Sequence, residues 1–173
     1  MSDIYWLDTS VLIESKRKYH KRERLPQFWT WLDKQLRAGV VKMPHAVYKE
    51  LCDGNDWLVD WCKHRQSIGV NVQHDDAIQT AYKQLQIYVG NKYKHVPHQI
   101  VEFSGGADGW VVAAARAKGG IVVSEEDKAK KNDTNNIKIP DLAKDFAERK
   151  WMHTFDMLDA LGADFSKGDD GEA

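Results

Sequence analysis

Short apolar runs separated by longer helix-like segments constrain the fold of this chain more than any other feature of its sequence. The runs are residues 4–7, 40–43, 121–123 and 137–140. Residues 4–7 are apolar without interruption, which is typical of a strand that other elements cover on both faces, and the runs at 40–43 and 137–140 each contain one lysine. The segments between them place apolar residues at helical spacing, as in residues 57–62. Strands that alternate with helices predict an α/β fold with a central, mostly parallel sheet.

Capping residues, prolines and glycines set the limits of the expected helices. Helices are expected from Thr9 or Ser10 past Ile13, from Pro26 to Leu36, from Pro44 through Leu51, over 57–62, from Asp75 or Asp76 to about Val89, over 110–115, from Asp141 onward and over 151–161. A loop is expected at 104–108. Since no Pro- or Ser-rich linker divides the chain, we expect one domain over residues 1–161 and a flexible tail over 162–173.

Composition narrows the classes of function. The formal net charge is −1, so any contact with nucleic acid requires a local basic patch. No apolar run approaches the roughly 20 residues that cross a bilayer, and the first residues lack the layout of a signal peptide. We therefore expect a cytoplasmic protein without membrane contact. Cys52 and Cys62 fit neither a disulfide framework nor a paired zinc site and are expected to be reduced thiols.

Acidic residues stand where the expected strands end or where the following helices begin. They are Asp8 after the first strand, Glu50 in the helix after the second, Asp108 at the start of the alanine-rich helix, and Glu126 with Asp127 after the third strand. Parallel α/β sheets bind ligands beyond the carboxyl ends of their strands. A doubly wound topology would bring these acids together at one edge of the sheet.

Carboxylates gathered in one place repel one another, so such a cluster needs protonation or a bound cation. Their hard oxygens select Mg²⁺ or Mn²⁺ over zinc. A divalent ion held by carboxylates can orient a phosphate and stabilise charge on its oxygens, which suits phosphodiester hydrolysis. Helix capping and solvated surface acids are the alternative explanation, because a helix dipole favours acids at helix starts.

Four segments together resemble the successive motifs of PIN-domain ribonucleases, whose best-known small members are VapC-type toxins of bacterial toxin–antitoxin pairs. The segments are LDTSVLI at 7–13, PHAVYKEL at 44–51, ADGWVVAAA at 107–115 and IVVSEED at 121–127. The resemblance implies a PIN-like three-layer fold with a central sheet flanked by helices. It also implies an Mg²⁺- or Mn²⁺-dependent endoribonuclease with an RNA substrate, an antitoxin partner and a possible homodimer.

The same resemblance assigns roles to residues. Asp8, Glu50 and Asp108 match the first three acids of the family, which bind metal and carry out catalysis. The fourth acid of the family follows a strand as Thr-x-Asp, whereas this chain has Ser124-Glu125-Glu126. Glu126 therefore matches the fourth acid, and Asp127 is the alternative ligand at that position. Ser10 and Ser124 are expected to support the site by orienting an acid or a water.

One dense basic run follows the first acid. Its cations, expected to bind RNA, are Lys16, Arg17, Lys18, Lys21, Arg22 and Arg24. Clustered cations with an interleaved aromatic could guide an RNA backbone through phosphate contacts and base stacking. A solvated loop or a surface that docks an acidic antitoxin would have the same composition.

The leading hypothesis is a metal-dependent endoribonuclease that acts as the toxin of a toxin–antitoxin pair. The alternative is a non-catalytic PIN-like interaction module, which the unusual fourth acid and the long segment between Glu50 and Asp108 favour. A phosphatase with a phosphoaspartyl intermediate needs Asp-x-Asp, and Asp8-Thr9-Ser10 lacks the second acid.

Overall fold

A four-stranded parallel sheet forms the centre of the fold. The computed structural model describes residues 3–19, 21–131 and 133–166, and no helix within them is long and apolar enough to span a membrane. The strands are β1 (Tyr5–Leu7), β2 (Val41–Lys42), β3 (Ile121–Val123) and β4 (Trp151–Met152). They lie in the order β2-β1-β3-β4, and every pairing is parallel. The predicted α/β class with a central parallel sheet flanked by helices is confirmed.

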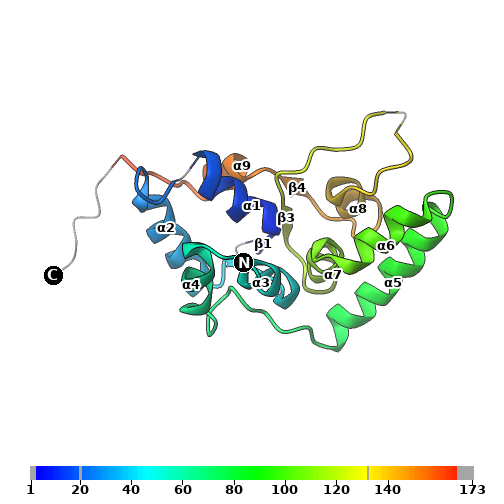
Figure 1. The fold of residues 1–173 in the computed structure, drawn as a ribbon, viewed down its shortest axis with the longest axis horizontal. Helices are drawn as coiled ribbons and strands as arrows, with labels where there is room; N and C mark the ends of the chain where they lie inside the picture. The colour runs from blue at the N-terminus through cyan, green and yellow to red at the C-terminus, as the bar shows by residue number, and fades with distance from the viewer. Residues whose placement is uncertain (1–2, 20, 132, 167–173) are drawn as a thin grey trace.

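Helices surround this sheet. They are α1 (Thr9–Glu14), α2 (Pro26–Arg37), α3 (His45–Cys52), α4 (Trp57–Lys63), α5 (Asp76–Lys92), α6 (Pro97–Gly105), α7 (Asp108–Lys118), α8 (Ile139–Asp145) and α9 (Thr154–Ala160), with a π-helical turn η1 (Ser15–Tyr19) after α1. In Figure 1, α5, α6, α7 and α8 lie together on one side of the strands, and α1, α2 and α4 lie on the other.

The boundary between the neighbouring strands β1 and β3 is the topological switch point of the sheet. The chain passes from β1 to β2 on one side and later places β3 on the opposite side of β1. Leu7 is paired with Val123, and the Asp8 N–H donates to the Val123 carbonyl at 2.9 Å. Ligands of open parallel sheets bind at the carboxyl ends of the strands at such a point. Asp8 and Ser124 are the residues that the two central strands bring there.

Helix α7 fills the space between the sheet and α5. It contacts both β1 and β3 and packs most extensively on α5. Residues 111–115 of this helix, VVAAA, are all buried. Their small side chains allow the backbone of α7 to approach both neighbours closely, since interiors are close-packed. This packing fixes Asp108, the first residue of α7, relative to the end of β1.

Gly120 makes the turn between α7 and β3 possible. Its φ is +108°, a backbone conformation that side chains with a Cβ rarely adopt. A Cβ at this position would also lie only 2.4 Å from the carbonyl oxygen of Ile4. The indole of Trp6 donates to the carbonyl of the preceding Gly119 at 2.9 Å and holds the same turn against β1.

The predicted fourth strand at 137–140 is wrong. Residues 139–145 form α8, with Pro140 in its first turn, and the fourth strand is Trp151–Met152. The four residues Ile-Lys-Ile-Pro are too few for their pattern to distinguish a strand from a buried helix start, and Pro suits the first turn of a helix because it lacks an N–H. The expected helix over 151–161 accordingly begins only at Thr154.

Two other boundaries differ from expectation. Helix α6 was not predicted as a helix, and it includes the first part of the loop expected at 104–108. Within the expected tail, Phe165 packs on α2, with ring centroids 6.2 Å from Phe28 and 6.1 Å from Trp31. Residues 162–166 therefore include a core-facing side chain, and the rest of the expected tail lies outside the described residues.

Candidate active site

Asp8 lies at the carboxyl end of β1 and is almost fully enclosed. Only 3% of its surface is exposed. Its Oδ2 accepts the Ser10 N–H at 3.3 Å and thereby caps α1. The expectation that Thr9 or Ser10 would cap this helix is therefore wrong, because the aspartate one or two residues earlier takes that position.

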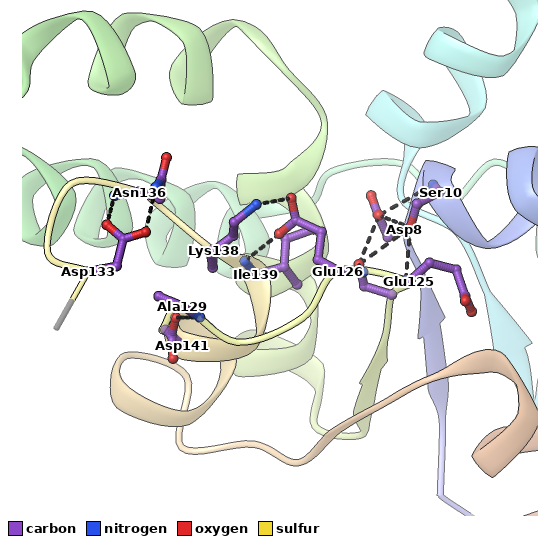
Figure 2. A network of polar contacts seen from close by, with 11 residues as sticks. Asp8, Ser10, Glu125, Glu126, Ala129, Asp133, Asn136, Lys138, Ile139 and Asp141 are labelled. Atoms are coloured by element: carbon purple, nitrogen blue, oxygen red, sulfur yellow. Dashed lines mark hydrogen bonds and ion pairs between the residues drawn. The ribbon is translucent and has the colours of Figure 1, made fainter. Parts of the chain in front are cut away.

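Two serine hydroxyls bind the same oxygen of Asp8. The Ser10 hydroxyl donates to Oδ2 at 2.5 Å (Figure 2), and the Ser124 hydroxyl donates to the same oxygen at 3.1 Å. Each hydroxyl also accepts a backbone N–H, from Glu125 for Ser10 and from Glu126 for Ser124. The two serines thus join the end of β1 to the end of β3 and fix the orientation of the Asp8 carboxylate.

The second carboxylate oxygen of Asp8 has no such partner. Oδ1 is buried, and no described residue donates a hydrogen bond to it. Burial raises the pKa of Asp8, and the hydrogen bonds from Ser10, Ser124 and the Thr9 and Ser10 amides oppose this effect only in part. A buried acceptor without a donor is costly unless it binds a proton or a cation.

Glu50 links three elements. Its Oε2 accepts the hydroxyl of Thr9 at 2.6 Å, and its Oε1 accepts the N–H of Ala107 at 3.0 Å. The carboxylate therefore connects α3, the start of α1 and the start of α7. This arrangement holds Asp108, the residue after Ala107, close to the end of β1.

Asp108 differs from its acidic neighbours because no described residue donates a hydrogen bond to its carboxylate. Burial, followed by the charges of Asp8, Glu126 and Glu50 in that order, raises the pKa of Asp108 from 3.8 to about 7. The cation of Lys138 opposes the shift. The structure therefore brings the four acids matched to the PIN motifs close enough to interact electrostatically.

Glu126 and Asp127 point in different directions. Oε2 of Glu126 accepts the N–H of Ile139 at 2.9 Å, and Oε1 lies 3.5 Å from the Lys138 ammonium, as Figure 2 shows. The Asp127 side chain is 91% exposed and lies 3.3 Å from Nε2 of His153. Of the two candidates for the fourth position, Glu126 is thus the one whose charge acts on Asp108.

A cavity of about 260 Å³ adjoins these acids. Asp108, Glu126 and Lys138 line it together with Gln99, Glu102 and Phe103 of α6. The unpredicted helix α6 therefore forms one wall of the candidate site. Lys138 was also not recognised from the sequence, where a single lysine before an apolar run carries no distinguishing signal.

Within the part of the chain that the structure describes, no three His, Cys, Asp or Glu side chains are already arranged around one point as a metal site. Electrostatic coupling acts over several ångströms, whereas Mg²⁺ requires its oxygens at about 2.1 Å. The carboxylate oxygens of Glu50 and Glu126 instead accept hydrogen bonds from neighbouring backbone and side-chain donors. Oδ1 of Asp8 and the carboxylate of Asp108 remain for a cation, and both are hard oxygen donors that fit Mg²⁺ or Mn²⁺.

The N-terminal basic run is partly engaged in contacts within the protein. Lys16 forms an ion pair with Asp56, and Lys18 lies 2.6 Å from Glu14. The guanidinium of Arg22 stacks on Trp57 at 5.3 Å from the ring centroid. The other predicted RNA-binding cations, Arg17, Lys21 and Arg24, are exposed. A role of this run in RNA binding remains a prediction.

Comparison with known proteins places the chain in a family. Residues 5–165 match the family described as "Domain of unknown function (DUF4411)". The chain belongs to this family. The DUF4411 match covers all four strands and every acid of the candidate site. No curated protein matches the chain.

Two solved structures are similar to this DUF4411 protein. VapBC2 from Rickettsia felis, bound to a DNA fragment from its promoter, aligns with a TM-score of 0.51 at 12% identity and covers 87% of this chain and 98% of the other. FitAcB from Neisseria gonorrhoeae aligns with a TM-score of 0.47 at 18% identity and covers 86% and 96%. The first likeness shows a shared PIN-like fold.

Proposed function

We propose that this DUF4411 protein is an Mg²⁺- or Mn²⁺-dependent endoribonuclease and the toxin of a toxin–antitoxin pair. The PIN-like fold, the motif resemblance and the four interacting acids at the switch point support this proposal. A protein antitoxin is the expected partner, and a homodimer is one possible assembly.

The observation that carries the proposal is the environment of Asp108. The other three acids each accept hydrogen bonds from described residues. Asp108 accepts none from the described residues, faces three further carboxylates and lines the cavity. Perturbed acids in a cavity are typical of functional sites, because a structural role alone gives no benefit from charge repulsion.

Asp8 through Oδ1 and Asp108 are the residues that would hold the cation, and Glu126 would join them by releasing Ile139. When bound, the ion would offset the negative charge that develops on the phosphodiester during hydrolysis. Ser10 and Ser124 hold Asp8 in its orientation. Glu50 holds the start of α7, and Lys138 offers a positive charge to a phosphate in the cavity.

The experiment is RNA cleavage by the purified chain with Mg²⁺, with Mn²⁺ and with chelator. We expect cleavage with either ion and none with chelator. Asp108→Asn should lower the cleavage rate at least 100-fold, as expected for loss of one electrostatic stabiliser. Asp159→Asn, an exposed acid on α9, serves as the matched control and should cleave at the parent rate. Equal rates for the two variants would remove Asp108 from the site.

A non-catalytic interaction module is the second candidate, because Glu50 and Glu126 already have hydrogen-bonding partners in the fold. A thermal melt with and without Mn²⁺ separates the two candidates, since a ligand that binds only the folded state raises its stability. The nuclease proposal predicts a higher melting temperature with Mn²⁺. An unchanged temperature favours the module.

A further inference from the structure

A second, basic cavity lies beside the edge strand β4. It has a volume of about 400 Å³, and we call it the β4 basic pocket. Its lining includes Lys128, Lys144, Glu148, Arg149, Lys150 and Trp151. These residues come from the loop after β3, from α8 and from the segment that leads into β4.

The charge of this pocket is strongly one-sided. Four of the lining residues named above are cations and one is an acid. Lys128, Lys144, Arg149 and Lys150 are all exposed, and within the described ranges none of them forms an ion pair with an acid. Since the whole chain carries a net charge of −1, this pocket concentrates positive charge that the composition does not reveal.

Contacts within the protein hold some of the residues that line the pocket. The Arg149 Nε donates to the carbonyl of Ala115 on α7 at 3.1 Å, which anchors this side chain to the core. The half-buried ring of Trp151 lies against His153, with centroids 4.7 Å apart, and the Lys128 ammonium lies 5.8 Å from the Trp151 centroid. An aromatic ring among cations is the combination that proteins use for single-stranded nucleic acids, because bases stack on the ring while phosphates contact the cations.

The position of the pocket connects it to the candidate active site. Lys128 belongs to the same loop as Glu126, two residues further along the chain. Trp151 is paired with Val122 in β3, the strand that delivers Ser124 to Asp8. The neighbouring His153 contacts the Ser124 carbonyl through its Nδ1 at 3.1 Å. Lys128 and Trp151 of the pocket therefore belong to segments that are joined to residues of the candidate site, through the loop after β3 and through the pairing of β4 with β3.

We infer that the β4 basic pocket binds the phosphodiester backbone of single-stranded RNA beside the cleavage site. This inference rests on the proposed function and names the surface that receives its substrate. The four acids repel a polyanion, so a substrate needs a concentrated positive surface next to them. The N-terminal basic run offers a weaker candidate, because Lys16 and Lys18 already form ion pairs with acids of the protein.

The test measures binding without cleavage. Fluorescence anisotropy of a labelled single-stranded oligouridine is followed in chelator over a series of salt concentrations. We expect Lys144→Ala/Lys150→Ala to weaken RNA binding at least tenfold. The dependence of the logarithm of the binding constant on the logarithm of the salt concentration should become less steep by about 1.4, since each phosphate contact on a single strand contributes about 0.7. Lys63→Ala/Lys83→Ala removes the same charge from exposed positions on α4 and α5 and should change binding less than twofold.

The outcomes are decisive for the pocket and separate from those of the nuclease proposal. Equal weakening by the two double variants would overturn the inference, because only bulk charge would then matter. A third outcome is that the parent chain binds RNA weakly but binds an acidic peptide, and that this peptide binding depends on Lys144 and Lys150. The pocket would then belong to a protein partner, and the RNA-binding inference would be overturned. In a fourth outcome, the parent chain binds RNA without cleaving it, and Lys144→Ala/Lys150→Ala alone of the two double variants weakens binding. That result would support the pocket and reject the nuclease proposal.

Discussion

At the scale of single residues, Asp8 and Asp108 show how the same side chain type is placed in two environments. Asp8 has one oxygen satisfied by Ser10 and Ser124 and one oxygen buried without a donor. The carboxylate of Asp108 is repelled by the charges of its acidic neighbours, and no described residue donates a hydrogen bond to it. Both arrangements are unfavourable for an ionised acid, which is the physical reason to expect a cation between them.

The raised pKa of Asp108 makes metal-free stability depend on pH. The folded state keeps this proton up to about pH 7, whereas the ordinary pKa is 3.8, so the folded state binds more protons between these values. Stability therefore falls as pH rises from about 4 to about 7 and then levels off. In chelator at pH 8, Asp108→Asn should be more stable than the parent by about 1–3 kcal/mol, and its pH dependence should be weaker. Urea unfolding at pH 5 and pH 8 measures both effects, and a less stable variant at pH 8 would contradict the clustered acids.

Ser124 offers a second test at this scale. Its buried hydroxyl donates to Asp8 and accepts from the Glu126 amide. Ser124→Ala should lower stability by about 1–3 kcal/mol, because the buried Asp8 carboxylate and the Glu126 amide each lose a hydrogen bond. Ser67→Ala, at an exposed position, should change stability by less than about 0.5 kcal/mol. Chemical unfolding of the two variants gives the comparison, and similar small effects would show that the hydroxyl does not hold the carboxylate.

At the scale of elements, the sequence patterns predicted most strands and helices because local signals and burial agree there. The start of α2 at Pro26 and the buried alanines of α7 are examples. The segment at 137–140 was assigned wrongly because its four residues, Ile-Lys-Ile-Pro, are too few to define a period. Helix α6 was missed because it has only Phe103 fully buried and otherwise lies at the surface. Both misassigned segments line the candidate site, so its walls could not be predicted from the motifs alone.

Two glycines provide a matched test of the elements that position the site. Gly120 turns the chain from α7 into β3 at a φ of +108°, against the backbone of Ile4. Gly90 lies inside α5, and a Cβ added there would have no atom within 4 Å. Gly120→Ala should lower stability by about 2 kcal/mol or more through strain and overlap. Gly90→Ala should raise it by about 0.5–1 kcal/mol, because alanine favours helices. Denaturant midpoints measure both, and equal effects would contradict the described turn.

At the scale of the whole molecule, the strand order β2-β1-β3-β4 explains why acids far apart in the chain meet. Asp8 ends β1, Glu126 follows β3, and Glu50 and Asp108 arrive on helices that pack around this switch point. The motif resemblance identified these four acids from the sequence. It could not show that Glu50 and Glu126 are occupied by backbone donors, because those contacts depend on how α7 and α8 begin.

The central claim is that the acids at the switch point share one divalent cation. Titration calorimetry of Mn²⁺ into the chelator-treated chain at pH 8 measures this directly, since Asp108 is then ionised. We predict saturable binding that Asp108→Asn weakens at least tenfold and that Asp159→Asn leaves unchanged. Absence of binding to the parent chain, or equal binding to the parent and Asp108→Asn, would contradict the account.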